Sequence, residues 1–293
     1  MNRNKRWLIP LGIALGGLLV YATMVEPRWL QLRKSRVNAR RLPHAFNGLR
    51  IALLTDLHVG GGTSVGLIRR AAALAQRQRP DLIALTGDFT TDSARDFNDV
   101  FAALSDLTAP LGVYAVPGNH DHVVGIDKWR DAIAHSRNLQ DLTNAYVLHE
   151  RLGARLCVAG VDDLKEGTPQ LRLPPQEGRD FTILLAHSPD QAERCRRNTD
   201  GIDLILSGHT HGGQVRLPGF APPMNSSNYP DLYVEGLRRR PWTQVYTSRG
   251  VGTIALPVRF MARPEVTLLE LSNAPRPRLP NAQAAYLRRV SVD

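Results

Sequence analysis

The chain has 293 residues, of which 43% are apolar and 22% charged, as in an ordinary folded protein. This length suits one large α/β domain or two small ones. The net charge of +10 is concentrated at the ends, because residues 1–41 hold nine Lys or Arg against one Glu and residues 276–293 hold four Arg against one Asp. The near-neutral remainder argues against an extended nucleic-acid groove and favours ends that lie near anionic lipid.

The first apolar stretch, residues 7–25, contains no charged residue and has close to the roughly 20 residues that a helix needs to cross a bilayer. Three interpretations fit it: a retained anchor over residues 1–25, a signal peptide cleaved near Ala22, or a buried helix. Six Lys or Arg follow within residues 28–41, against three before the stretch, and such charge resists translocation. We therefore favour an uncleaved single-pass anchor, with the body of the chain on the cytoplasmic side.

The remaining chain divides into three segments. Residues 26–48 are expected to form a basic connector, either a solvated linker or a segment whose Trp29 lies at the lipid interface. Residues 49–273 carry the folded domain. Residues 274–293 form a basic tail, in which residues 283–290 have the pattern of a short helix.

Within residues 49–273, short apolar runs alternate with helical patterns, which predicts a layered α/β sandwich. Ser64 is the expected N-cap of the first helix. Residues 144–161 have the pattern of a hairpin. The predicted strands are 49–54, 82–85, 112–116, 181–186, 203–206, 215–217, 244–247 and 266–271, and the predicted helices are 64–78, 96–107, 126–136 and 189–197.

Five of these apolar runs end in side chains that bind metals, at the strand ends where open α/β sheets place their chemistry. The set contains carboxylates, an amide and imidazoles but no thiolate, which suits Mn²⁺, Fe²⁺, Mg²⁺ or Zn²⁺ in an open catalytic site. Seven donors exceed the needs of one tetrahedral ion, so two ions are implied. Two such ions about 3.5–4 Å apart stabilise both the attacking and the leaving oxygen of a phosphoryl displacement. The seven residues are Asp56, His58, Asp88, Asn119, His187, His209 and His211.

The order Asp-x-His, Gly-Asp, Gly-Asn-His-Asp, His, Gly-His-Thr-His over residues 56–211 resembles the calcineurin-like metallophosphoesterase superfamily. The resemblance implies a βαβ sandwich of two mixed β-sheets flanked by helices. It makes His120 the acid that protonates the leaving oxygen, with Asp121 orienting it; the alternative is that His120 only positions other groups. It also implies one metal held by Asp56, His58, Asp88 and His211, and a second held by Asp88, Asn119, His187 and His209, with Asp88 as the bridge.

Further motifs, among them residues 212–214, 248–253 and 263–265, are similar to membrane-associated bacterial phosphodiesterases of this superfamily. Some of those are UDP-2,3-diacylglucosamine pyrophosphatases of lipid A synthesis. The resemblance implies a Mn²⁺-preferring phosphodiesterase or pyrophosphatase at the bacterial inner membrane, with a lipid-linked substrate and no nucleic-acid partner. Arg249 and Arg259 are candidate phosphate clamps by charge, with surface salt bridges as the alternative. A nucleotide phosphodiesterase or nuclease and a non-enzymatic membrane scaffold are the competing functions.

Overall fold

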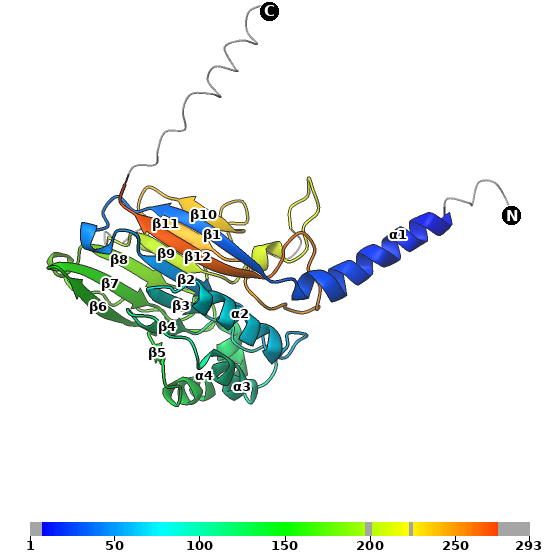
Figure 1. The fold of residues 1–293 in the computed structure, drawn as a ribbon, viewed down its shortest axis with the longest axis horizontal. Coiled ribbons are helices and arrows are strands. Elements are labelled where there is room, and N and C mark those ends of the chain that lie inside the picture. Colours follow the sequence, from blue (N-terminus) through cyan, green and yellow to red (C-terminus); the bar gives the residue numbers. More distant parts are fainter. Residues whose placement is uncertain (1–7, 197–200, 223–224, 275–293) are drawn as a thin grey trace, which may run out of the picture.

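A computed structural model describes residues 8–196, 201–222 and 225–274, and it contains two six-stranded β-sheets packed face to face (Figure 1). The strand order is β1-β12-β2-β3-β4-β5 in the first sheet and β10-β11-β9-β8-β7-β6 in the second. Each sheet contains parallel and antiparallel neighbours. The expected architecture of two mixed sheets with flanking helices is confirmed. The expected tail lies outside the described residues beyond position 274, and so does the helical pattern at 283–290.

The bounds of the elements are as follows. The first sheet contains β1 (Gln31–Asn38), β2 (Arg50–Leu54), β3 (Leu82–Thr86), β4 (Val113–Val116), β5 (Leu139–Asp141) and β12 (Glu265–Ser272). The second contains β6 (Ala145–Arg151), β7 (Ala154–Gly160), β8 (Phe181–Leu185), β9 (Leu204–Ser207), β10 (Gly236–Arg239) and β11 (Gln244–Thr247). The α-helices are α1 (Leu8–Val20), α2 (Val65–Arg77), α3 (Asp96–Leu104), α4 (Asn119–Ala134) and α5 (Gln191–Cys195).

Alternate residues of the central strands belong to two different hydrophobic cores. Ala52 and Leu54 of β2 pack under the helices α2, α3 and α4, which cover the outer face of the first sheet. Ile51 and Leu53 point the other way and pack against the second sheet, where they join residues such as Ile183. Side chains of a strand alternate between its faces, so a strand buried on both sides appears as an unbroken apolar run. This arrangement leaves the strand ends as the places for polar side chains.

Most predicted elements are confirmed, and two differ for local reasons. The Ser64 hydroxyl accepts the Leu67 N–H at 3.3 Å, as expected of the N-cap of α2. Helix α4 begins at Asn119, well before the predicted residue 126, and it is kinked at Gly125, whose φ is 141°. Residues 215–217 do not form a strand, because only Val215 makes a bridge, to Phe260.

The expected connector contains a strand. Residues 31–38 form β1, which pairs in parallel with β12 from Gln31 opposite Glu265 to Asn38 opposite Ser272. β1 is the edge of the first sheet, and polar side chains are normal on an exposed edge strand. The polar side chains of β1 gave no strand pattern in the sequence, so this strand was not predicted. Its partner, β12, lies more than 200 residues away in the sequence. The folded domain therefore begins before Leu49, and only a short segment separates it from the apolar helix.

The apolar N-terminal segment is helical and joins the domain directly. The helical stretch Ile9–Arg28 is long and apolar enough to cross a membrane, by length and composition. Its final turns pack against the domain. Ala22 is buried, and its carbonyl accepts the backbone N–H of Arg259 at 2.9 Å. The buried Glu26 carboxylate accepts the Ala262 N–H at 2.7 Å. The last turns of this helix are thus part of the folded body.

Candidate metal centre

The seven predicted donor residues all follow the carboxyl ends of strands, five of them in loops and two, Asn119 and His211, at the start of a helical turn. Asp56 and His58 follow β2, Asp88 follows β3, Asn119 follows β4, His187 follows β8, and His209 and His211 follow β9. Strands from both sheets end at the same place, so residues spread over more than 150 positions meet there. Their contacts form two adjacent groups.

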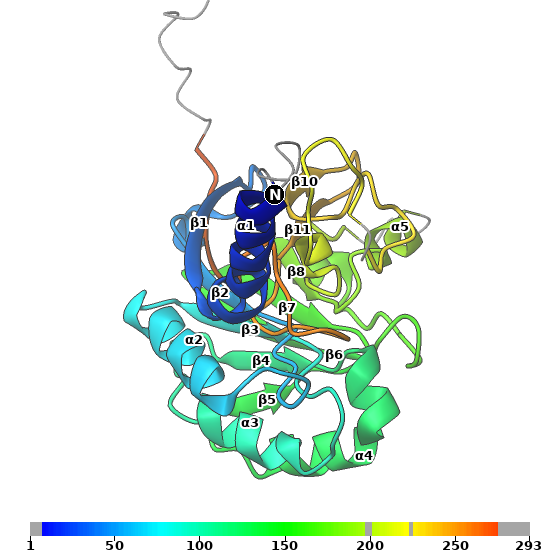
Figure 2. The ribbon, with the colours of Figure 1, turned by 90° about the vertical axis from the view of Figure 1, so that its right-hand side faces the viewer.

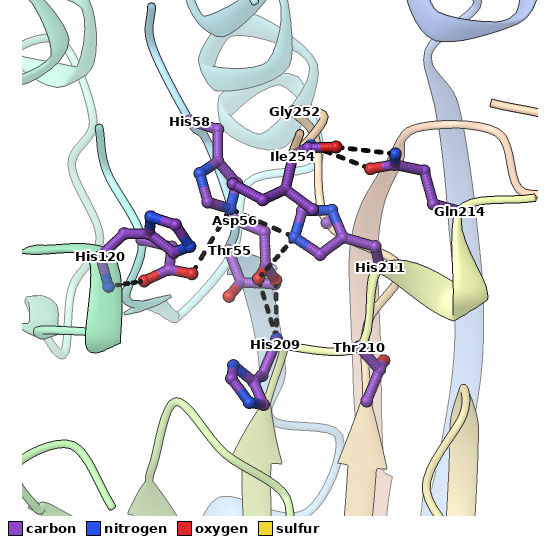
Figure 3. Close-up of polar contacts among 12 residues, drawn as sticks. Thr55, Asp56, His58, His120, His209, Thr210, His211, Gln214, Gly252 and Ile254 are labelled. Carbon is purple, nitrogen blue, oxygen red and sulfur yellow. Dashed lines mark hydrogen bonds and ion pairs between the residues drawn. The ribbon is translucent and has the colours of Figure 1, made fainter. Parts of the chain in front are cut away.

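The first group consists of Asp56, His58 and His211, all buried (Figure 3). The Nε2 atoms of His58 and His211 lie 3.2 Å apart, and His211 Nε2 lies 3.4 Å from Asp56 Oδ1. The other ring nitrogen of His58, Nδ1, lies 3.1 Å from the Thr91 hydroxyl, and this contact orients the ring. The group thus presents two imidazole nitrogens and one carboxylate oxygen to a common point.

The second group consists of Asp88, His187 and His209, which are also buried. His187 Nε2 lies 2.9 Å from His209 Nδ1, 3.2 Å from Asp88 Oδ2 and 3.2 Å from Asn119 Oδ1. The same oxygen of Asp88 lies 3.4 Å from His58 Nε2 in the first group. The Asp88 carboxylate therefore stands between the two groups.

The backbone of these loops is strained at the donor residues. Five of the seven adopt positive φ angles between 47° and 72° although they are not glycines: Asp56, His58, Asp88, His209 and His211. Such conformations cost on the order of 1–3 kcal/mol each and persist where surrounding structure enforces them, typically at functional sites. Two glycines provide close approach: a Cβ on Gly118 would lie 2.2 Å from Asp88 Oδ1, and one on Gly208 would lie 2.1 Å from Asp56 Oδ2.

The chemistry of the donor set fits divalent metal ions. Burial lowers the pKa of His209 and of His211 well below the ordinary value of 6.5, so both rings are neutral and offer a lone pair. Burial alone would raise the pKa of Asp88, but His187 and His58 hold it well below its ordinary value. Imidazole nitrogens face each other in both groups, His58 Nε2 toward His211 Nε2 and His187 Nε2 toward His209 Nδ1. Imidazole nitrogens and carboxylate oxygens that converge in this way are the ligands that divalent metal ions bind in proteins.

His120 lies at the edge of the two groups. Its ring centroid is 5.0 Å from that of His58, in an edge-on arrangement, and its backbone N–H donates to Asp88 Oδ1 at 2.9 Å. The side chain is only partly buried, and that burial lowers its pKa. The imidazole therefore lies next to the donors (Figure 3), and it is partly exposed to solvent.

The contacts of Asp121 are with backbone groups of two loops. Its carboxylate is fully buried and accepts three backbone N–H groups, from Gly118 at 2.8 Å, Asp88 at 2.9 Å and Phe89 at 2.8 Å. Burial, and then the charge of Asp88, raise its pKa to about 7. Asp121 thus joins the loop after β3 to the loop after β4, which fixes the positions of Asp88 and Asn119.

The two candidate phosphate clamps are engaged elsewhere. Arg259 is fully buried, and its guanidinium donates to the carbonyls of Gly252 at 3.0 Å, Ala262 at 2.7 Å and Arg249 at 2.9 Å. This contradicts the expected phosphate contact, because a guanidinium bound to backbone carbonyls inside a loop does not reach a substrate. Arg249 pairs with Glu235 and lies 3.7 Å from Glu265, in agreement with the salt-bridge alternative.

Sequence reasoning missed two supporting residues. Gln214 is buried, and its amide bonds to the Ile254 carbonyl at 3.0 Å and to the Ile254 N–H at 2.9 Å, so it joins the loop after His211 to residues 249–262 (Figure 3). The His122 ring lies 2.6 Å from the Asp162 carboxylate, and this hydrogen bond raises the pKa of His122. The Gly-Gly-Gln run at residues 212–214 indicated an unusual loop, but no sequence pattern indicated that Gln214 would contact Ile254.

The fold and this pair of donor groups define a dinuclear metal hydrolase. The family profile for calcineurin-like phosphoesterases matches residues 49–213. The chain is 32% identical over 267 residues to the uncharacterized metallophosphoesterase YkuE of Bacillus subtilis, covering 89% of this chain and 92% of that one. It is 35% identical over 262 residues to phosphodiesterase YaeI of Escherichia coli, covering 86% and 92%.

A third relative is the Danio rerio transmembrane protein with metallophosphoesterase domain, at 30% identity over 254 residues. That match covers 81% of this chain but only 56% of the zebrafish protein. The chain belongs to the calcineurin-like phosphoesterase family and is a metal-dependent phosphoester hydrolase.

Asp121→Asn should destabilise the fold and reduce metal binding. The amide nitrogen would face a backbone N–H, and a buried donor without a partner costs about 1–3 kcal/mol. Urea unfolding and metal analysis of the purified protein measure both effects. Asp127→Asn is the matched control, because that side chain is 88% exposed on the same helix and should change stability by less than about 0.5 kcal/mol. Normal stability with reduced turnover alone would instead support an orienting role toward His120.

Proposed function

We propose that this protein hydrolyses a P–O bond of a phosphodiester or pyrophosphate at a membrane surface, with Mn²⁺ as the preferred metal and Fe²⁺, Mg²⁺ or Zn²⁺ as substitutes. The observation that carries the proposal is the position of Asp88 between two buried groups of nitrogen and oxygen donors. When bound, two divalent ions supply Lewis-acid stabilisation of phosphate charge and lower the pKa of water to near neutrality.

The chain's own residues hold and orient this chemistry. Asp56, His58 and His211 would hold one ion, Asn119, His187 and His209 the other, and Asp88 would contact both. The carbonyl of Thr86, 2.8 Å from His187 Nδ1, fixes the proton on that nitrogen and turns Nε2 toward the centre. Donors whose orientation is set in advance cost little reorganisation during the reaction.

His120 is the proposed general acid. Its ring lies beside the donors, is partly open to solvent and comes from the first turn of α4. It would donate a proton to the departing oxygen, and solvent would return the proton afterwards. Its backbone bond to Asp88 holds the first turn of α4 in register with the donors.

The proposed setting is the bacterial inner membrane, with the domain on the cytoplasmic side and a lipid-linked substrate such as UDP-2,3-diacylglucosamine. Support comes from the apolar helix Ile9–Arg28, from the six Lys or Arg in residues 28–41, and from relatives named as transmembrane proteins. The near-neutral body of the domain disfavours long nucleic-acid tracks.

Metal removal tests the reaction class. Protein stripped with a chelator should not hydrolyse bis(p-nitrophenyl) phosphate, and added Mn²⁺ should restore hydrolysis, because the charge on phosphate is otherwise uncompensated. Asp88→Asn should not recover under the same conditions, whereas Asp127→Asn should recover like the unaltered protein. Equal rates in the stripped and Mn²⁺-loaded samples would refute the proposal.

His120→Asn tests the acid. Turnover of a diester with a poor alkoxide leaving group should fall by roughly 10²–10⁴-fold, the usual contribution of proton transfer. With p-nitrophenolate as leaving group the loss should be much smaller, because that oxygen hardly needs a proton. Metal content should stay unchanged. Loss of metal would identify His120 as a ligand, and equal losses for both leaving groups would restrict it to a positioning role.

The substrate class is tested in cells. Mass spectrometry of lipid extracts should show a phosphodiester- or pyrophosphate-linked lipid accumulating when the gene is deleted. The unaltered gene should reverse the accumulation, and a gene carrying Asp88→Asn should not. Unchanged lipid extracts together with changed soluble nucleotides would favour the nucleotide phosphodiesterase alternative.

A further inference from the structure

The metal centre and the apolar helix lie at the same end of the molecule. β1 begins three residues after Arg28 and runs parallel to β12, which in turn runs antiparallel to β2. β3 and β4 run parallel to β2. The carboxyl ends of β2, β3 and β4, which carry donors, therefore lie at the end where β1 begins. Figure 2 views the domain from this end, with α1 pointing toward the viewer.

The base of the helix is fixed to this end by several contacts. Besides the bonds of Ala22 and Glu26 described above, the Tyr21 ring lies edge-on to Phe260 with centroids 6.5 Å apart. The guanidinium of Arg263 lies 3.9 Å over the Trp29 ring and donates to the Trp29 carbonyl at 3.2 Å. A Trp–Arg pair at the end of an apolar helix is typical of a membrane interface. The domain therefore cannot turn freely relative to the helix.

Four large apolar side chains are exposed on two loops at this end, and together they form what we call the loop surface. Leu217 and Phe220 are 51% and 74% exposed, and Leu256 and Met261 are 63% and 53% exposed. The two loops touch each other, because Arg216 N–H donates to the Phe260 carbonyl at 2.9 Å. Single exposed apolar residues are ordinary on soluble proteins, but several together mark an interaction site.

The same two loops reach the metal centre. The first leaves His211 and is joined to the second through Gln214. The second donates the Gly252 N–H to the Asp56 carbonyl at 2.6 Å, and a Cβ on Gly250 would lie 2.5 Å from Asp56 Cβ. The exposed apolar side chains and the donor residues thus belong to one connected loop structure.

We infer that the loop surface lies in the interfacial layer of the bilayer that α1 enters, so that the metal centre opens onto the lipid headgroups. The inference rests on the proposed membrane attachment of α1. The occupant is a lipid surface, because the loop surface is continuous with the base of an apolar helix that is only 11% buried in the protein. The apolar faces of interfacial helices reach about 5–10 Å into the boundary between headgroups and acyl chains, and exposed apolar loop residues beside α1 would enter the same layer. A phosphate ester at headgroup depth would then meet the centre without leaving the membrane.

Site-directed fluorescence on the full chain tests this placement. Phe220→Cys and Leu256→Cys are each labelled with an environment-sensitive dye and reconstituted into vesicles of phosphatidylcholine and phosphatidylglycerol, with or without nitroxide-labelled lipid. Both native cysteines are buried, and the unaltered chain gives the labelling background. Emission at both positions should shift to shorter wavelength and be quenched by the nitroxide lipid.

Two further positions make the outcome decisive. Leu152→Cys is the matched negative control, because this leucine is 92% exposed before β7, at the amino end of the strands and away from the donors. Leu15→Cys in α1 reports insertion of the helix. Quenching at Leu15 without quenching at Phe220 and Leu256 would overturn the inference but not the membrane attachment. Quenching at Leu152 equal to that at Phe220 and Leu256 would do the same. An unquenched Leu15 overturns it together with the membrane attachment, while hydrolysis of a soluble diester by the same samples tests the enzyme separately.

Discussion

The Asp88 carboxylate is the charge on which the rest of the centre depends. It is buried and lies within 3.4 Å of an imidazole nitrogen from each donor group, so an uncompensated negative charge would be very costly there. Asp121 holds its backbone and His120 N–H bonds its other oxygen. Asp88 is itself one of the five donor residues with positive φ, and such strained conformations persist where the surrounding structure enforces them.

The donor set could be predicted from the sequence because each member follows a buried strand. Apolar runs that stop at Asp56, Asp88 and His209 indicate both the strands and the edge where their ends meet. Local signals also identified the cap at Ser64 and the hairpin around Gly153. These features depend on neighbours in sequence, or on a rule that applies to all parallel sheets.

What could not be predicted depends on contacts between distant segments. The charge of Arg259 suggested a phosphate contact, but its carbonyl partners become visible only once residues 249–262 are folded. Asp121 follows His120 in the sequence, which suggested that its carboxylate orients that ring. Two of its three hydrogen bonds are instead with backbone N–H groups of the loop after β3. β1 was hidden because an edge strand need not be apolar. In each case the residue type could be read from the sequence, but the segment that it contacts could not be predicted.

The pairing of β1 with β12 has a consequence for biosynthesis. The apolar helix and β1 leave the ribosome well before β12, the strand that pairs with β1. Long-range pairing of this kind is slow to form and leaves an edge open in the meantime. The first sheet and the Arg259 loop that supports Asp56 therefore cannot be completed until β12 has been made. Under the proposed membrane attachment, the chain would be anchored before its metal centre could form.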